Sequence, residues 1–287
     1  MIQLIDSGSV AFPAPAKLNL FLHVTGRRAD GYHEIQTLFQ LIDLCDEIHI
    51  QPNQSGEVVR VFGDYGVSAE QDLAVRAARL LQRVTGVGAG AGIGVNKRIP
   101  LGAGLGGGSS DAATVLLALN HLWKTDLDVD ELARLGTTLG ADVPVFVRGH
   151  SAMAGGIGDE LQPVALGQRY YVLVFPEVAV ATVDVFNHPT LVRDSRPIDL
   201  IDALAGRGRN DCQPVAEMIH PLLGRMAQEL RQWGHPRLTG TGSGIFLEMA
   251  DENAAINAAQ EIKCRYNVRA VRGCDRSPMH TLLAQLP

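Results

Sequence analysis

The feature that most constrains this chain is a glycine-rich segment between an apolar strand and an apolar helix. Residues 100–110 read Pro-Leu-Gly-Ala-Gly-Leu-Gly-Gly-Gly-Ser-Ser, with five glycines among the seven residues 102–108. Glycine lets the backbone approach an anion closely, and the N-terminus of the following helix adds partial positive charge. The segment therefore predicts a phosphate-binding loop. A tight helix-entry turn with Ser109 or Ser110 as N-cap is the structural alternative.

This loop differs from the common nucleotide-binding fingerprints. A Walker A loop needs Gly-Lys-Ser/Thr, but Gly107 is followed by Gly108 and Ser109, so the loop lacks the lysine that reaches the terminal phosphates. A P-loop NTPase is thereby excluded. A second glycine-rich stretch, residues 86–95, leads into a strand and fits the dinucleotide-binding spacing poorly, which favours a flexible connection.

Hydrophobic periodicity predicts an α+β chain. Asp72 is expected to cap a helix, Gly140 to close another, and the nearly all-apolar helix after the glycine-rich segment to be buried. Strands are expected at residues 18–24, 35–44, 46–51, 95–99, 170–175, 244–249 and 268–272, and helices at residues 72–85, 111–123, 130–139, 213–231 and 252–263.

Size and composition limit the classes of protein to consider. A chain of 287 residues exceeds the usual size of one compact core, so we expect two domains, 1–160 and 161–287. The net charge of −6, with no basic stretch, argues against nucleic-acid binding. No apolar run is suited to crossing a membrane. The four cysteines are scattered without a Cys-x-x-Cys pair, which favours a reducing compartment and a cytoplasmic location.

Several polar residues are candidates for chemistry, each with a plainer alternative. Lys17 and Asn19 fall on the same face of a strand, although Lys17 by itself indicates a surface cation. Tyr32 and His33 follow a turn glycine and suit a flat heterocycle, although a plain turn explains them too. Asp142 follows a helix end, where capping is the usual role. The small-residue loop Gly240–Gly244 fits either a phosphate contact or a structural turn.

Taken together, these segments resemble the superfamily of galactokinase, homoserine kinase, mevalonate kinase and phosphomevalonate kinase (the GHMP kinases). The shared order is a lysine strand, a Gly-Leu-Gly-Gly-Gly-Ser-Ser loop and a late Gly-Ser/Thr-Gly loop. Within that superfamily the chain is similar to the 4-diphosphocytidyl-2-C-methyl-D-erythritol kinases of the non-mevalonate isoprenoid pathway. That similarity rests on Pro15-Ala-Lys-Leu-Asn-Leu, Arg28-Ala-Asp-Gly-Tyr-His, Gly140-Ala-Asp-Val-Pro-Val-Phe and Asn210-Asp-Cys.

The resemblance implies roles for particular residues. Lys17 and Asp142 would be the catalytic pair. The ATP-binding loop would comprise Pro100, Leu101, Gly102, Ala103, Gly104, Leu105, Gly106, Gly107, Gly108, Ser109 and Ser110. The small-molecule cytidyl alcohol would be surrounded by Asn19, Tyr32, His33, Thr182 and Phe186. One departure from the family pattern is Ala103, where glycine is common, and we expect only a local adjustment there.

The resemblance also implies a two-domain α+β GHMP-kinase fold. Its N-terminal, ATP-binding α/β domain would resemble ribosomal protein S5, and its C-terminal, substrate-binding domain would be ferredoxin-like. ATP and Mg²⁺ are the implied cofactors, but the sequence identifies neither the metal ligands nor the oligomeric state. Two alternatives stay open: a GHMP kinase that acts on a different alcohol, and a nucleotide-sensing module that binds ATP without transferring phosphate.

Overall fold

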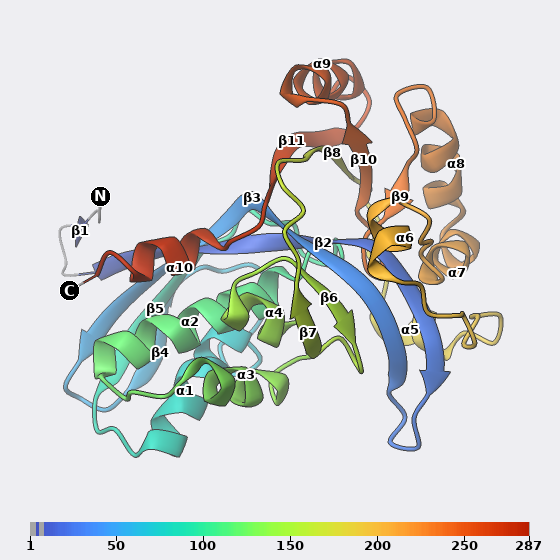
Figure 1. Cartoon of the computed structure of the whole chain (residues 1–287). Helices are drawn as coiled ribbons and strands as arrows, with labels where there is room; N and C mark the ends of the chain where they lie inside the picture. The colour runs from blue at the N-terminus through green and yellow to red at the C-terminus, as the bar shows by residue number, and fades with distance from the viewer. Residues whose placement is uncertain (1–3, 6–8, 287) are drawn as a thin grey trace.

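The fold is built on a ribbon of two long antiparallel strands, β2 (Ser9–Arg27) and β3 (His33–Asn53). The computed structural model describes residues 4–5 and 9–286, and Figure 1 shows this blue ribbon running through the whole molecule. The strands predicted at 18–24, 35–44 and 46–51 are parts of these two. Asp46 does not end a strand but lies within β3, where it pairs with Ala14 of β2, and its buried carboxylate accepts the backbone N–H groups of Arg98 and Ile99, at 2.6 and 2.8 Å.

Further short strands join this ribbon and extend it into a sheet. β5 (Gly90–Asn96) pairs antiparallel with β3, β4 (Val58–Phe62) runs parallel to β5, and the hairpin of β6 (Ala152–Gly155) and β7 (Glu160–Pro163) pairs with β3. β1 (Leu4–Ile5) pairs with β2. The predicted flexible connection at 86–95 is therefore wrong for Gly90 onward. Glycine serves packing there, since a Cβ on Gly94 would lie 2.0 Å from the ring of Phe62.

Four helices cover one face of this sheet: α1 (Leu73–Thr85), α2 (Gly107–Trp123), α3 (Val129–Thr137) and α4 (Val143–Arg148). The predicted Asp72 cap of α1 and the burial of α2 are both confirmed. Two predicted ends are wrong. α2 begins four residues before Asp111, at Gly107, because Gly106 acts as N-cap, and α3 ends at Thr137 with Thr138 rather than Gly140 as C-cap.

The C-terminal part forms a second group of strands in the order β11 (Asn267–Cys274), β8 (Tyr170–Phe175), β10 (Ile245–Met249), β9 (Arg237–Leu238). Gly273 and Cys274 pair with β3, so β11 joins both groups into one sheet. The hairpin of β6 and β7 spans residue 160, and a domain boundary near that residue stays a prediction.

The helices of the C-terminal part are α5 (Thr182–Asn187), α6 (Leu200–Leu204), α7 (Cys212–Ile219), α8 (Pro221–Leu230), α9 (Glu252–Ile262) and α10 (Pro278–Leu283). The single helix predicted at 213–231 is wrong, because Pro221 divides it. A proline disfavours helical geometry in the residue before it, and His220 has φ −125° and ψ 87°. In the described part of the chain, no helix is long and apolar enough to span a membrane.

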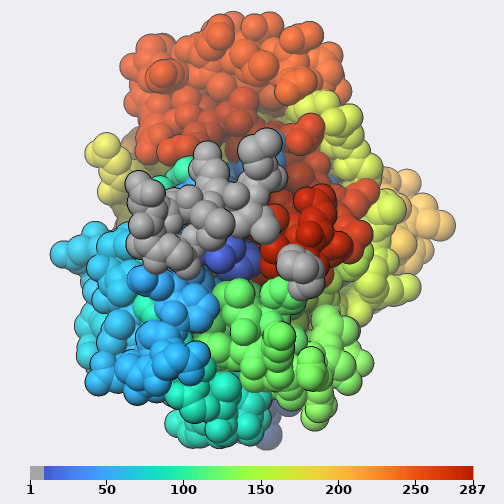
Figure 2. All heavy atoms as spheres, turned by 90° about the vertical axis from the view of Figure 1, so that its left-hand side faces the viewer, coloured from blue at the N-terminus to red at the C-terminus, as the bar shows by residue number. Residues whose placement is uncertain are grey.

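The C-terminal segment returns to the first part of the chain. Figure 2 shows it in dark red between the orange α9 region above and the green helices below. α10 packs on β2, and the ring of His280 makes a 2.8 Å hydrogen bond between Nε2 and the carbonyl oxygen of Val147, at the end of α4. The segment therefore supports the helix that begins just after Asp142.

The packing of α2 generates a stability prediction. Leu116 is fully buried in the core that α2 shares with α1 and the sheet, so Leu116→Ala should lower the free energy of unfolding by about 2–5 kcal/mol. Ile201 is 74% exposed, so Ile201→Ala serves as the control and should change the free energy of unfolding by less than about 0.5 kcal/mol. Urea unfolding of both variants measures the difference, and equal midpoints would contradict the placement of α2.

Candidate functional site

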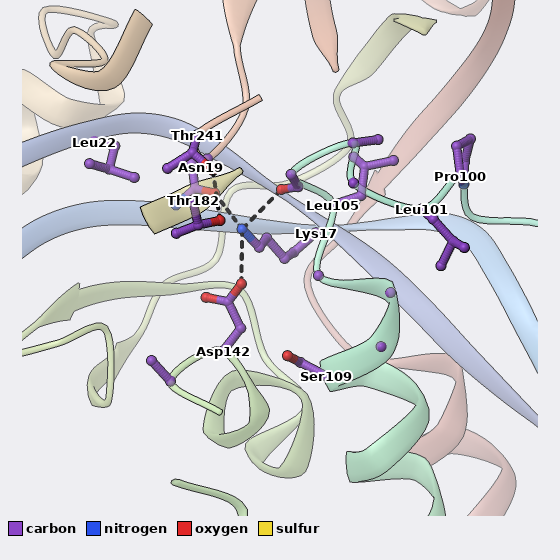
Figure 3. A pocket seen from close by; sticks show the side chains of 18 of the residues that line it. Lys17, Asn19, Leu22, Pro100, Leu101, Leu105, Ser109, Asp142, Thr182 and Thr241 are labelled. Carbon is purple, nitrogen blue, oxygen red and sulfur yellow. Dashed lines mark hydrogen bonds and ion pairs between the residues drawn. The ribbon is translucent and has the colours of Figure 1, made fainter. Parts of the chain in front are cut away.

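The centre of the site is the buried ammonium group of Lys17. The sequence by itself indicated a surface cation there, yet Lys17 on β2 is only 3% exposed. Its Nζ donates to Asn19 Oδ1 at 2.5 Å and to the Gly104 carbonyl oxygen at 3.1 Å, and lies 3.2 Å from Asp142 Oδ2. A lysine ammonium has three N–H donors, and three oxygens surround this one (Figure 3). The burial of the charge is therefore compensated.

Three separate segments supply those oxygens. Asn19 lies two residues from Lys17, on the same face of β2, as the strand period requires. Gly104 belongs to the glycine-rich loop. Asp142 immediately precedes α4, whose first turn carries a proline, and its carboxylate makes no capping hydrogen bond to the helix. The side chain, about one-third exposed, is thus free to face both Lys17 and the solvent-filled cavity.

The orientation of the Asn19 amide follows from its partners. Lysine only donates, so the oxygen of the amide faces Lys17, and its nitrogen donates to the Thr37 hydroxyl at 2.9 Å. That hydroxyl donates in turn to the carbonyl oxygen of Phe21. The backbone N–H of Asn19 donates to Thr239 Oγ1 at 3.0 Å. The side-chain oxygen, the side-chain nitrogen and the backbone N–H of Asn19 therefore each have a hydrogen-bond partner whose donor or acceptor role is defined.

The glycine-rich loop needs glycine at particular positions. Gly102, Gly104 and Gly106 have φ values of +67°, +70° and +70°, in the left-handed region that side chains disfavour. A Cβ on Gly104 would lie 2.1 Å from the carbonyl oxygen of Thr239, and one on Gly106 would lie 3.1 Å from Cε of Lys17. The loop is thus pressed against the lysine and against the C-terminal part of the chain.

The first turn of α2 opens on a cavity. Gly107, Gly108 and Ser109 line a cavity of about 520 Å³, and no side chain of the described residues caps the helix with a hydrogen bond. Unsatisfied N–H groups at a helix N-terminus attract anions. Ser110 differs from the rest of the predicted loop: it is fully buried, does not line the cavity, and its hydroxyl has no partner among the described residues.

The loop Gly240–Gly244, whose role the sequence left open, supports the glycine-rich loop from behind. The backbone N–H groups of Ser243 and Gly244 donate to the carbonyl oxygens of Gly102 and Ala103, at 3.0 and 3.2 Å. Asn210 in turn donates to the carbonyl oxygen of Gly240 at 2.8 Å. The motif Asn210-Asp-Cys contributes to the family resemblance, but the sequence assigns no role to Asn210. Because each of these contacts is made to a backbone carbonyl oxygen, side-chain patterns do not reveal them.

A buried ion cluster that sequence reasoning missed lies beneath the same turn. Lys97 donates to Asp46 and, at 2.8 Å, to Asp111 Oδ2. Burial raises the pKa of Asp111 to about 8, with Lys97 opposing the shift and Asp46 adding to it. Lys97 also lines the cavity next to Gly107. The only sequence signal was that Lys97 and Asp111 flank the glycine-rich loop.

A second cavity, of about 480 Å³, adjoins the first. Tyr32, His33, Thr182 and Phe186 all line it, and Thr182 and Phe186 line both cavities. The rings of His33 and Phe186 lie 5.0 Å apart between centroids, while Tyr32 is 58% exposed at the rim. Thr182 Oγ1 lies 3.1 Å from Thr241 Oγ1. The structure therefore brings these four predicted residues together, next to the cavity that Asn19, Lys17 and Asp142 line.

Comparisons with known proteins agree with this architecture. Residues 72–150 match the family model described as GHMP kinases N terminal domain. Relatives called 4-diphosphocytidyl-2-C-methyl-D-erythritol kinase include one from Halorhodospira halophila, 49% identical over 96% of both chains, and one from Thiobacillus denitrificans, 48% identical over 96% of this chain and all of that one.

A solved structure of 4-(cytidine 5'-diphospho)-2C-methyl-D-erythritol kinase is 37% identical, with a TM-score of 0.78 over 92% of this chain and 99% of that one. A mevalonate kinase, at 15% identity over 92% of this chain and 98% of that one, shares the fold with a TM-score of 0.66. The expected α+β GHMP-kinase fold is thus confirmed. The chain belongs to the 4-diphosphocytidyl-2-C-methyl-D-erythritol kinase family within the GHMP kinases and is an ATP-dependent kinase.

Proposed function

We propose that this chain transfers the γ-phosphoryl group of ATP to the 2-hydroxyl of 4-diphosphocytidyl-2-C-methyl-D-erythritol. The observation that carries the proposal is the position of the Lys17–Asp142 pair. Both residues line the cavity formed by the glycine-rich loop, and Ala141, next to Asp142, also lines the adjoining aromatic cavity. A phosphoryl donor in one cavity and an alcohol in the other would meet at this pair. The names of the relatives support the choice of alcohol.

The glycine-rich loop is the proposed site of the ATP phosphates. The loop residues from Pro100 to Ser109 line the cavity, and the uncapped first turn of α2 offers N–H groups and the positive end of its dipole. Ser110 lies within that first turn but is buried and does not line the cavity. Because the loop contains no lysine, the nearby ammonium groups of Lys17 and Lys97, which line the same cavity, provide the positive side-chain charge.

The second cavity is the proposed site of the cytidyl group. Tyr32 and Phe186 offer aromatic faces for stacking a flat base, and His33 offers a ring nitrogen for a hydrogen bond. Asn19 and Thr182 lie closer to Lys17 and would contact the part of the substrate that carries the reacting hydroxyl. In this arrangement the base of the substrate lies at the rim of the second cavity and its alcohol lies at the proposed catalytic pair.

Phosphoryl transfer passes through a loose transition state, so positioning and charge stabilisation dominate its catalysis. The Asp142 carboxylate would orient the substrate hydroxyl and accept its proton as the new bond to phosphorus forms. The Lys17 ammonium, 3.2 Å from that carboxylate, would stabilise negative charge on the transferred group. Lys17 also favours the ionised form of its partner, so we expect orientation and late proton acceptance rather than early deprotonation.

We also propose that Mg²⁺ accompanies ATP. Magnesium commonly binds through one or two carboxylates together with substrate phosphates. The Asp142 carboxylate and the Ser109 hydroxyl both line the cavity, and Figure 3 shows them on the same side of the glycine-rich loop. These two oxygens fit such a partly hydrated ion and would hold it. When bound, Mg²⁺ would neutralise charge on the phosphate oxygens.

Two organisational proposals follow. The chain divides near residue 160 into an ATP-binding part, 1–160, and a substrate-binding part, 161–287, and each part supplies most of one buried cluster. It acts in the cytoplasm, where ATP is abundant and where the four free cysteines, Cys45, Cys212, Cys264 and Cys274, would remain reduced.

The Asp142 assignment predicts a loss of turnover in Asp142→Asn. The amide keeps the shape of the carboxylate but loses its charge and basicity, so kcat should fall by about 10²–10⁴-fold while the affinity for ATP measured without Mg²⁺ changes little. Asp194→Asn, at an exposed residue, serves as the matched control. For each variant, steady-state kinetics measures kcat and ATP titration measures the affinity for ATP. Near-full turnover with unchanged substrate binding in Asp142→Asn would refute the catalytic roles of both Asp142 and Lys17.

The glycine-rich loop predicts different effects for two equivalent substitutions. Gly102 and Gly104 have nearly the same positive φ, but a Cβ at 102 meets nothing within 4 Å, whereas one at 104 lies 2.1 Å from a carbonyl oxygen. Gly104→Ala should therefore weaken ATP binding by about tenfold or more relative to Gly102→Ala, since strain of ~1–3 kcal/mol is added. Calorimetric titration with ATP tests this. Equal affinities would place the triphosphate away from Gly104.

The choice of substrate predicts the outcome of a transfer assay. With γ-labelled ATP and separate samples of the cytidyl alcohol, mevalonate, homoserine and galactose, the label should pass to the cytidyl alcohol. Preferred labelling of a different alcohol would indicate another GHMP-kinase activity. ATP binding without any labelled product would favour a nucleotide sensor over an enzyme.

A further inference from the structure

Arg193 links the two ring walls of the second cavity. Its guanidinium donates to the carbonyl oxygens of Phe186, His188 and Leu191, at 2.8, 2.9 and 3.1 Å. A further donor, Nε–H, lies 3.1 Å from Nε2 of His33. Arg193 therefore holds the chain at the end of α5, where Phe186 lies, and at the same time contacts the ring of His33. Neither the sequence motifs nor the proposed catalytic roles use it.

This contact decides where His33 carries its proton. An arginine guanidinium has only donors, so Nε2 of His33 must be the acceptor and must be unprotonated. The hydrogen of the neutral ring then lies on Nδ1. Burial lowers the pKa of His33, and the positive charges of Arg193 and Arg27 lower it further. The geometry and the surrounding charges thus agree on a neutral ring with an Nδ1–H donor.

The Nδ1–H group is available to a ligand. No described residue accepts a hydrogen bond from Nδ1, and this nitrogen is not among the fully enclosed polar atoms without a partner. His33 lines the second cavity, where the Phe186 ring packs beside it at an interplanar angle of 31°. The cavity therefore presents one hydrogen-bond donor of fixed identity next to an aromatic face.

We propose that Arg193 is a positioning residue that fixes His33 as the Nδ1–H tautomer and so makes this cavity selective for cytosine over uracil. The proposal rests on the proposed cytidyl substrate and deepens it. Both bases accept at O2, so the Nδ1–H donor is placed opposite N3, which accepts in cytosine but carries N–H in uracil. A donor facing a donor leaves both groups unpaired, and a site built for one hydrogen-bond pattern rejects the other. Without Arg193, His33 is free to exchange tautomers and accept as well as donate.

The test compares CDP and UDP as probes on the full chain. Wild-type protein should bind CDP more tightly than UDP by about tenfold or more. In Arg193→Met the two affinities should come within about threefold of each other, whereas Arg193→Lys, which keeps a cationic donor, should retain most of the selectivity. Arg196→Met is the matched control, because Arg196 is exposed and its side chain has no polar partner among the described residues.

A spectroscopic measurement separates tautomer control from simple loosening of α5. Nitrogen-15 NMR distinguishes protonated from unprotonated ring nitrogens, and His33 is assigned by its missing signals in His33→Asn. We expect an Nδ1–H tautomer in wild-type and Arg196→Met, and a tautomer mixture in Arg193→Met. An unchanged tautomer, or unchanged CDP/UDP selectivity, in Arg193→Met would overturn the proposal. Wild-type protein that binds UDP as tightly as CDP would also overturn it, whereas wild-type protein that binds neither diphosphate would refute the cytidyl substrate itself.

Discussion

The site depends on one buried charge. Lys17 sits in the interior on β2, where an ammonium group without partners would be very costly, and three oxygens from three distant parts of the sequence compensate for it. Asn19 comes from the same strand, Gly104 from the glycine-rich loop and Asp142 from the start of α4. Correct folding of all three segments is therefore required before the charge is tolerated. The same condition brings Lys17 and Asp142, the proposed catalytic pair, together beside the glycine-rich loop.

The glycine-rich loop is held on both sides by hydrogen bonds to its own backbone carbonyl oxygens. In front, Lys17 donates to the Gly104 carbonyl oxygen, and behind it Ser243 and Gly244 donate to Gly102 and Ala103. The side-chain hydroxyl of Thr239 lies 3.3 Å from the same Gly104 oxygen. A loop fixed in this way needs little rearrangement to meet an anion, and preorganised donors are the main means by which proteins stabilise developing charge. The two halves of the chain thus share the task of shaping one loop.

Sequence patterns predicted most of the regular elements because their hydrophobic periodicity reflects burial on one face. The errors have identifiable causes. Residues 90–96 form a strand although they contain three glycines, because Phe62 and Val61 of β4 occupy the space that side chains would fill. The helix predicted at 213–231 ignored the proline at its centre. The start of α2 was placed too late because a Gly-Gly-Ser-Ser run reads as a loop by propensity.

By itself, the sequence determined the fold class, the position of the glycine-rich loop at residues 100–110 and the membership of the GHMP kinases, since these depend on local residue order and spacing. Only the tertiary structure decided that Lys17 is buried, that the loop Gly240–Gly244 supports the glycine-rich loop, and that Arg193 donates to His33. Apart from the contact between Lys17 and Asn19, these contacts join residues 87 or more positions apart. Their partners are set by how the long β2–β3 ribbon and the C-terminal strands come together, which no local pattern encodes.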